Sequence, residues 1–169
     1  MSDSDPNQII HELNLVPHPE GGYFSETYRN KAVIPAESHL VMGERNVSTA
    51  IYYLLRSEDI SRFHRIRSDE IWHHYYGSAV TLHIIHTDGL YEAKYVGKNF
   101  SDGERPQCVV PAGAWFGATV DKENSFALCG CTVAPGFDFD DFEMADRYMM
   151  LQAFPEHKAI VKKLLPDNL

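Results

Sequence analysis

Residues 63–77 read FHRIRSDEIWHHYYG and combine the side chains that bind metal ions or transfer protons. His64 and Glu70 lie on two neighbouring β-rich runs, and His74 shares the face of Glu70 because side chains alternate along a strand, whereas His73 points the other way. Three ligands, His64, Glu70 and His74, could hold zinc or iron with open coordination positions. Without an ion, Glu70 can accept the His64 ring N–H, fix its tautomer and raise its pKa. The segment therefore predicts either a metal centre or a tuned pair of a histidine and an acid.

Aromatic and cationic side chains near this segment suit a small organic ligand. Tyr23, Trp72 and Phe116 have flat rings that can stack on a nucleobase or a sugar, with core packing as the alternative for each ring. Arg29 and Arg62 have the planar fork that binds phosphate through two parallel hydrogen bonds. The candidate ligand-binding residues are Tyr23, Arg29, Arg62, Trp72, His74 and Phe116.

The elements that must position these side chains are mainly short strands. Runs rich in Val, Ile, Tyr, Phe and Thr fill residues 20–140, separated by turn signals such as TDG, SDG and PAG. Strands do not alternate with helices, so we expect an all-β sandwich or small barrel. Helical patterns flank it at residues 6–16 and at residues 142–165, the second broken near Pro155. With 169 residues, the chain should form a single domain.

The order of these residues resembles the cupin superfamily of double-stranded β-helix barrels. Its first motif, G(x5)HxH(x3-4)E(x6)G, matches at His64, Glu70 and Gly77, and its second, G(x5)PxG(x2)H(x3)N, matches at Pro111 and Gly113. Longer stretches, among them LVPHPEGGYFSETYR, VVPAGAWFGA and VAPGFDFDDFE, resemble the cupin-like family of domains of unknown function numbered 985. This resemblance implies a jelly-roll barrel that is usually a homodimer, and it carries no assigned reaction.

Two metal-ligand positions of the cupin motifs are apolar in this chain. The second His of the first motif is Ile66, and the His that follows P-x-G is Phe116. We therefore expect a metal-independent barrel with no cofactor, whose apolar pocket binds a small organic ligand. In such a barrel the EGGYFSETYR segment can fold over the mouth, so that Tyr23, Ser25, Glu26 and Arg29 contact the ligand or a partner subunit.

The metal-free precedent within the cupins is dTDP-4-dehydrorhamnose 3,5-epimerase, in which a histidine held by a carboxylate removes a proton next to a ketone. On this resemblance His64 is the base, Glu70 its orienting group, and Tyr53 or Tyr76 the acid. The expected ligand is a nucleotide or nucleotide-linked sugar, with epimerase or isomerase activity. Two alternatives stay open: a metal-dependent oxygenase or isomerase that uses His64, Glu70 and His74, and a binding module without turnover.

Composition excludes several classes of partner. The net charge of −9, from 24 acidic and 15 basic residues, disfavours a nucleic-acid polymer. No apolar run approaches the roughly 20 residues that cross a bilayer, and the first residues are acidic, so we expect neither membrane insertion nor secretion. Three cysteines without disulfide-framework spacing fit a reducing compartment, and we expect a cytoplasmic protein. The outward-facing His73 and Tyr75 offer a surface for a symmetric partner chain.

Overall fold

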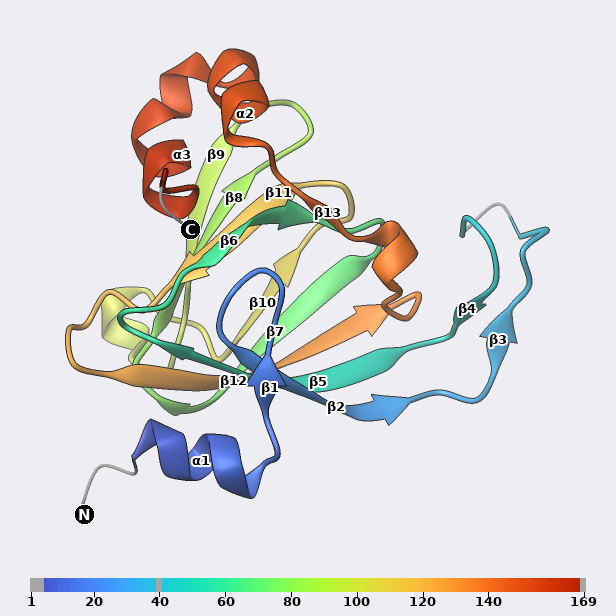
Figure 1. Cartoon of the computed structure of the whole chain (residues 1–169), viewed down its shortest axis with the longest axis horizontal. Helices are drawn as coiled ribbons and strands as arrows, with labels where there is room; N and C mark the ends of the chain where they lie inside the picture. The colour runs from blue at the N-terminus through green and yellow to red at the C-terminus, as the bar shows by residue number, and fades with distance from the viewer. Residues whose placement is uncertain (1–4, 39–40, 168–169) are drawn as a thin grey trace.

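Two β-sheets lie face to face in the computed structural model, which describes residues 5–38 and 41–167 (Figure 1). The six-stranded sheet has the order β1-β2-β5-β12-β7-β10, with strands Val16–Pro17, Tyr23–Arg29, Thr49–Arg56, Phe126–Ala134, Asp69–Gly77 and Gln107–Val110. The five-stranded sheet has the order β13-β6-β11-β8-β9, with strands Glu143–Met144, Ser61–Arg65, Trp115–Thr119, Val80–Ile85 and Tyr91–Val96. All pairings within these two sheets are antiparallel. The predicted all-β jelly roll is confirmed.

The main core fills the space between the two sheets, and strand alternation determines which side chains enter it. In β8, Val80, Leu82 and Ile84 point into this core, whereas Ile85 joins a second cluster on the outer face of the sheet. The outward-facing Thr81 and His83 are polar and form side-chain hydrogen bonds with Asp121 and Tyr91, so the first five residues of the strand alternate between apolar and polar. Packing between the two sheets therefore fixes the positions of the inward-facing side chains, including those that line the functional site.

The N-terminal helix α1 (Pro6–Glu12) covers the outer face of the six-stranded sheet. Asp5 caps it by accepting a hydrogen bond from the main-chain N of Asn7 at 2.9 Å, and Pro6 occupies its first turn. The helix ends before the predicted residue 16 because Asn14 adopts a left-handed conformation with φ of 51°. Leu15 then packs with Leu54 and other apolar side chains beneath the helix.

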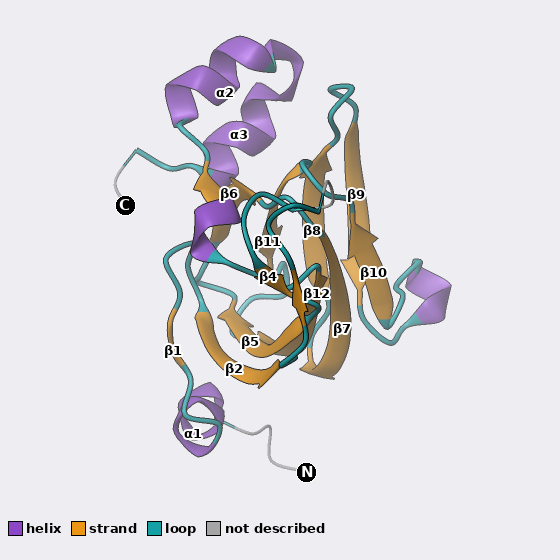
Figure 2. Cartoon of the chain, turned by 90° about the vertical axis from the view of Figure 1, so that its right-hand side faces the viewer, coloured by secondary structure: helices purple, strands orange, loops and turns teal. Residues whose placement is uncertain are grey.

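The C-terminal helices cover the outer face of the five-stranded sheet, at the opposite end of the molecule from α1 (Figure 2). Helix α2 (Arg147–Ala153) and helix α3 (Lys158–Leu164) are separated by a 3-10 turn, η3 (Pro155–His157), so the predicted break at Pro155 is confirmed. Met150 and Leu164 pack against Phe63 and Ile85 of the sheet. The predicted helical segment from residue 142 begins instead with β13, and a short 3-10 turn, η2 (Phe139–Asp141), precedes it.

A two-stranded arm, β3 (Val33–Ile34) and β4 (Arg45–Asn46), projects from the barrel beside η2 (Figure 1). Arg45 anchors it through a two-fold hydrogen bond to Asp141, with Nε–Oδ2 and Nη2–Oδ1 distances of 2.7 and 3.0 Å. Another 3-10 turn, η1 (Phe100–Asp102), lies between β9 and β10. Within the part of the chain that the structure describes, no helix is long and apolar enough to cross a membrane.

Candidate functional site

A cavity of about 240 Å³ opens between the two sheets. The six-stranded sheet supplies most of its walls, and the loop between β1 and β2 (residues 18–22) and the segment around η2 complete it. Figure 1 shows that loop, in blue, in front of the barrel strands. The apolar lining consists of Phe24, Ile51, Ile66, Val133, Phe137, Phe139 and Phe142, and the ionisable lining of His18, Glu20, Glu26, Arg29, Tyr53, His64, Glu70, Cys131 and Asp138.

A buried carboxylate, Glu20, lies at the centre of the polar groups and is only 6% exposed. Its Oε1 accepts a hydrogen bond from Ser61 Oγ at 2.8 Å. Its Oε2 lies 3.1 Å from His64 Nε2 and 3.3 Å from His18 Nδ1. A buried carboxylate needs such donors to offset the loss of its hydration. The cluster is therefore one carboxylate held between two imidazoles and a hydroxyl group.

The β1–β2 loop places Glu20 in the cavity through main-chain contacts with β6. The main-chain N of Arg62 donates to Glu20 O at 2.9 Å. Gly21 has φ of 119°, and a Cβ at this position would collide with the main-chain oxygen of Ile60. Only glycine fits such a left-handed position packed against another backbone. Tyr53 closes the arrangement from β5, donating its hydroxyl proton to Gly21 O at 2.7 Å.

Both ring nitrogens of His64 are engaged. Nδ1 lies 2.7 Å from the main-chain oxygen of Arg62, which can only accept, so Nδ1 carries a proton. A hydrogen bond between Nε2 and Glu20 Oε2 then requires one further proton, which His64 and Glu20 share. Phe116 packs against the imidazole, with ring centroids 4.1 Å apart, on the adjacent strand. His64 is therefore a group that holds Glu20 in place, with no ring nitrogen left for a ligand.

His18 has a free ring nitrogen at the same carboxylate. Its Nδ1 accepts a hydrogen bond from the main-chain N–H of Glu20 at 3.3 Å in one tautomer, and in the other tautomer it can donate to Glu20 Oε2, also at 3.3 Å. Nε2 has no hydrogen-bond partner among the described residues. Burial lowers the pKa of His18, with the charge of Glu20 opposing this and that of His64 adding to it. An uncharged imidazole held by a carboxylate at one nitrogen can accept a proton at the other. In the tautomer that carries its proton on Nδ1, His18 thus has the geometry of a general base.

Glu70 is a second buried carboxyl group, and its properties differ from those of Glu20. Burial and the nearby charge of Glu20 raise its pKa to about 8, with weaker opposing effects from Cys131 and Trp72. Glu70 is therefore mainly protonated at neutral pH and can donate a hydrogen bond. The next inward residue of β7, Trp72, is 1% exposed, and its Nε1 has no hydrogen-bond partner.

The structure brings together five of the predicted site residues: Arg29, Tyr53, His64, Glu70 and Trp72 all line the cavity. The prediction that Glu70 orients His64 does not fit the contacts, because the carboxylate beside His64 is Glu20. Tyr53 is a poor acid, since burial and the charge of Glu20 raise its pKa well above 10.

Three further candidates lie outside the cavity. Phe116 is fully buried behind the His64 ring. Tyr23 points to the opposite face of β2, where its hydroxyl group accepts a hydrogen bond from Arg56 at 3.1 Å; its neighbour Phe24 lines the cavity instead. Arg62 donates from Nε to Glu20 O at 3.3 Å and from Nη2 to a neighbouring main-chain oxygen, so it supports the β1–β2 loop.

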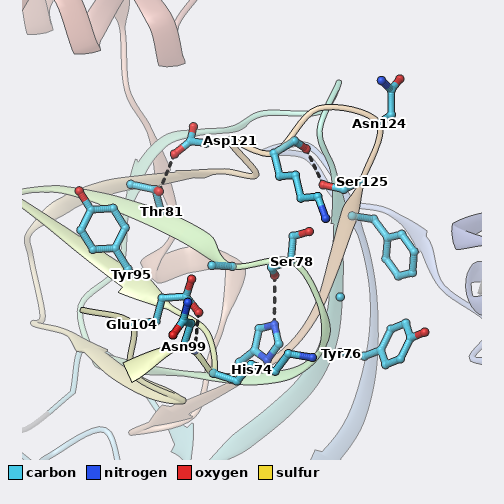
Figure 3. A pocket seen from close by; sticks show the side chains of 15 residues that line it. His74, Tyr76, Ser78, Thr81, Tyr95, Asn99, Glu104, Asp121, Asn124 and Ser125 are labelled. Atoms are coloured by element: carbon cyan, nitrogen blue, oxygen red, sulfur yellow. Dashed lines mark hydrogen bonds between the residues drawn. The ribbon is translucent and has the colours of Figure 1, made fainter. Parts of the chain in front are cut away.

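His74 and Tyr76 lie in a different pocket, at the other end of β7 (Figure 3). His74 Nε2 donates to the main-chain oxygen of Ser78 at 3.0 Å, and Tyr76 is partly exposed. His74 does share the face of Glu70, but four residues along a strand correspond to about 13 Å, and Trp72 fills the space between them. The proposed ligand set of His64, Glu70 and His74 is therefore not assembled. Among the described residues, no three His, Cys, Asp or Glu side chains are placed to hold a metal ion.

Sequence reasoning missed His18 and Glu20 as site residues. His18 and Glu20 lie 46 and 44 positions before His64, so no local spacing links them to it. The usable signal was the pair Gly21 and Gly22, which indicates close approach to another backbone. Of the four residues that this segment was expected to bring to the ligand or a partner subunit, Glu26 and Arg29 line the cavity, as part of β2.

Comparisons with known proteins agree with this architecture. Residues 7–145 match the family model described as Cupin superfamily (DUF985). An uncharacterized protein of Saccharomyces cerevisiae is 34% identical over 150 residues, covering 82% of this chain and 74% of the yeast protein. A solved structure from Leishmania major is 34% identical and matches over 95% of this chain and 98% of its own, with a TM-score of 0.88. A solved structure from Shewanella oneidensis is 36% identical and matches over 96% of this chain and 98% of its own, also with a TM-score of 0.88. An oxalate decarboxylase of Bacillus subtilis, 15% identical with a TM-score of 0.55 over 88% of this chain and 36% of its own, shares the fold.

Proposed function

The chain belongs to the DUF985 family of the cupin superfamily, and from this premise we propose that it is a metal-independent isomerase or epimerase. In this proposal it moves a proton on a small carbonyl compound bound in the barrel cavity. The observation that supports it is the pairing of two unlike proton-transfer groups in one cavity: His18, whose pKa burial lowers, and Glu70, whose pKa burial raises to about 8. Environments that separate two groups in this way are typical of an acid and a base.

The proton transfer is assigned as follows. Glu70 donates a hydrogen bond to the carbonyl oxygen of the substrate, which withdraws electrons from the adjacent C–H bond. His18 Nε2 accepts the proton from that carbon, in the tautomer whose Nδ1–H donates to Glu20. The electron pair of the C–H bond moves into the enol, and the Glu20 carboxylate stabilises the imidazolium that forms. Protonation of the same carbon by water on the face opposite His18 gives an epimer. Return of the proton from His18 to the former carbonyl carbon gives an isomer, in which Glu70 gives its proton to the original carbonyl oxygen and takes the proton of the neighbouring hydroxyl group.

The size and charge of the cavity favour a single sugar-sized, uncharged ligand. Its volume of about 240 Å³ lies below the roughly 300–1,000 Å³ of pockets that take drug-sized molecules. Arg29 is the one Lys or Arg side chain that lines it among the described residues, and Glu26 already binds the Arg29 guanidinium at 2.9 and 2.7 Å. Of the two predicted ligands, the sugar of a nucleotide-sugar fits this site, and its nucleotide would lie outside the cavity.

Solvent exchange tests the proposal directly. The protein is incubated in D₂O with dihydroxyacetone, glyceraldehyde and fructose, and deuterium entering the carbon next to the carbonyl group is followed by NMR. We expect exchange above the protein-free rate with at least one compound, and a loss of about 100-fold or more in His18→Gln and Glu70→Gln. His86→Gln is the matched control, because His86 pairs with Glu92 away from the cavity. Equal exchange in His18→Gln and the unaltered protein contradicts the assigned base.

Binding without exchange gives the outcome for a non-catalytic module. In that case one of these compounds raises the melting temperature, since it binds only the folded state, while no deuterium enters it. His18→Gln would then leave the affinity largely unchanged. This result would replace the isomerase with a binding protein that uses the same cavity.

A further inference from the structure

The indole N–H of Trp72 is an unusual feature of the barrel interior. Trp72 is 1% exposed and lines the cavity, and its Nε1 has no hydrogen-bond partner among the described residues. Among those residues the other buried side-chain nitrogen or oxygen atom without a partner is Nε of Arg147, in helix α2 outside the barrel, whose Nη1 forms an ion pair with Asp167. Buried polar groups in native proteins almost always have a partner, and one without it indicates a missing water or ligand. The Trp72 indole N–H therefore lacks the acceptor atom that a ligand would supply.

A second donor lies beside it. Glu70 and Trp72 are alternate residues of β7, so both side chains project from the same face of the strand. The protonated Glu70 carboxyl group has an O–H to donate. Glu20 accepts from Ser61 and His64, and Gly21 O accepts from Tyr53, so these acceptors are already used. The indole of Trp72 lies close enough to Glu70 to lower the pKa of its carboxyl group, but no hydrogen bond joins the two side chains. The protein therefore presents two donors to the cavity.

We propose that the Trp72 N–H and the Glu70 O–H bind the same oxygen atom of the ligand, so that the cavity selects an uncharged compound with a carbonyl oxygen on an apolar body. Phe24, Ile51 and Ile66 provide the apolar surface for that body. This rests on the proposed function only in placing the ligand in the barrel cavity, and it holds equally for a binding protein.

Hydrogen-bond donors disfavour an amine ligand, and charge disfavours a carboxylate ligand. An ammonium or amine group brings donors to a place that already has two, and leaves the indole N–H without an acceptor. A carboxylate supplies oxygen atoms but brings a negative charge beside Glu20, with Glu26 and Asp138 at the mouth. Two converging donors favour the oxygen atom of a ketone or aldehyde, and they stabilise it further as it gains negative charge.

A matched series of six-membered rings tests the proposal: cyclohexanone, cyclohexylamine and cyclohexanecarboxylate. The chain has two tryptophans, so an ¹⁵N-labelled sample gives two indole N–H signals, and the spectrum of Trp72→Phe assigns them. We expect cyclohexanone to move the Trp72 indole signal downfield in a saturable way at pH 7. The amine and the carboxylate should leave it in place at the same concentrations. This measurement needs only the unaltered protein, so it remains decisive if Trp72→Phe does not fold.

Affinity and pH provide the second readout. Trp72→Phe keeps the ring but removes the donor, and should weaken cyclohexanone binding about 3- to 10-fold, as expected for one hydrogen bond. Trp115→Phe is the control, because Trp115 packs under Arg65 outside the cavity lining and should bind as the unaltered protein does. Binding to the unaltered protein should weaken as the pH rises past about 8, where Glu70 loses its proton, and this dependence should vanish in Glu70→Gln, which keeps a donor.

Two results overturn the inference: an equal response of the Trp72 signal to ketone and amine, or a Trp72→Phe variant that folds and binds cyclohexanone as tightly as Trp115→Phe. The deuterium exchange assay separates this inference from the proposed function. A Trp72 signal that cyclohexanone shifts, without deuterium exchange into dihydroxyacetone, glyceraldehyde or fructose, refutes the isomerase and keeps the donor pair. Exchange without a shifted signal does the reverse.

Discussion

Replacing Glu70 with Gln should stabilise the protein at neutral and alkaline pH and leave its stability almost unchanged at pH 4. The pKa of Glu70 rises from 4.5 to about 8 on folding, so the folded state keeps a proton that the unfolded chain releases in this range. Stability must therefore fall as the pH rises from 4.5 to 8. Each pH unit in that window contributes about 1.4 kcal/mol. Wild-type Glu70 thus costs about 3 kcal/mol at pH 7 and ~5 kcal/mol above pH 8, which Gln removes because it cannot ionise.

Urea unfolding of both proteins at pH 4, 5, 7 and 9 measures this difference. Glu58→Gln is the matched control, since its side chain is 64% exposed and its contact with Arg56 is a surface ion pair. The free energies of unfolding of Glu70→Gln and the wild type should diverge between pH 5 and 8, with the control parallel to the wild type. If Glu70→Gln also stays parallel to the wild type throughout, Glu70 is ionised in the folded protein. Its assignment as the acid and as a donor beside Trp72 would then fail.

Two further substitutions test contacts around the cavity, and one mass measurement tests the predicted homodimer. His64→Ala should destabilise the protein by about 3 kcal/mol in urea unfolding, because it removes an imidazole partner of the buried Glu20 carboxylate. A loss below about 1 kcal/mol would mean that Ser61, His18 and water suffice. Gly22→Ala should lower the melting temperature and reduce the free energy of unfolding by about 1–3 kcal/mol. Gly22 has φ of 67°, and a Cβ at this position would lie 2.8 Å from Leu54 O. An unchanged melting temperature would show that the loop adjusts. Light scattering should give twice the chain mass of 19.2 kDa if the predicted homodimer forms, and a single chain mass contradicts it.

Periodicity and turn signals were enough to predict the barrel and part of its lining. Alternation along β7 correctly placed Glu70 and Trp72 on the inward face. Alternation does not predict which cavity a residue on that face lines. His74 was therefore assigned to the same site as Glu70, although it lines the pocket at the other end of the strand. Strand phase was also ambiguous in β2, where the adjacent rings of Tyr23 and Phe24 fit either face.

The carboxylate that binds His64 could not be predicted because its position depends on long-range contacts. Glu20 reaches His64 through a main-chain hydrogen bond from Arg62 and through the backbone geometry of Gly21, and no local pattern in the sequence encodes that pairing. Glu70 was in contrast identified as an important acid, but its partner was not. Its raised pKa comes from burial and from Glu20, both of which exist only in the folded chain.

The two kinds of acid in this barrel belong to two different parts of the backbone. Glu70 projects from a central strand that pairs on both sides, whereas Glu20 comes from a five-residue crossing between β1 and β2. Exchanging that short crossing for another sequence would remove the proton acceptor while leaving the strands, their pairing and the indole beside Glu70 intact. Relatives with this scaffold can thus differ in reaction through changes in the β1–β2 loop alone, while the core between the two sheets stays the same.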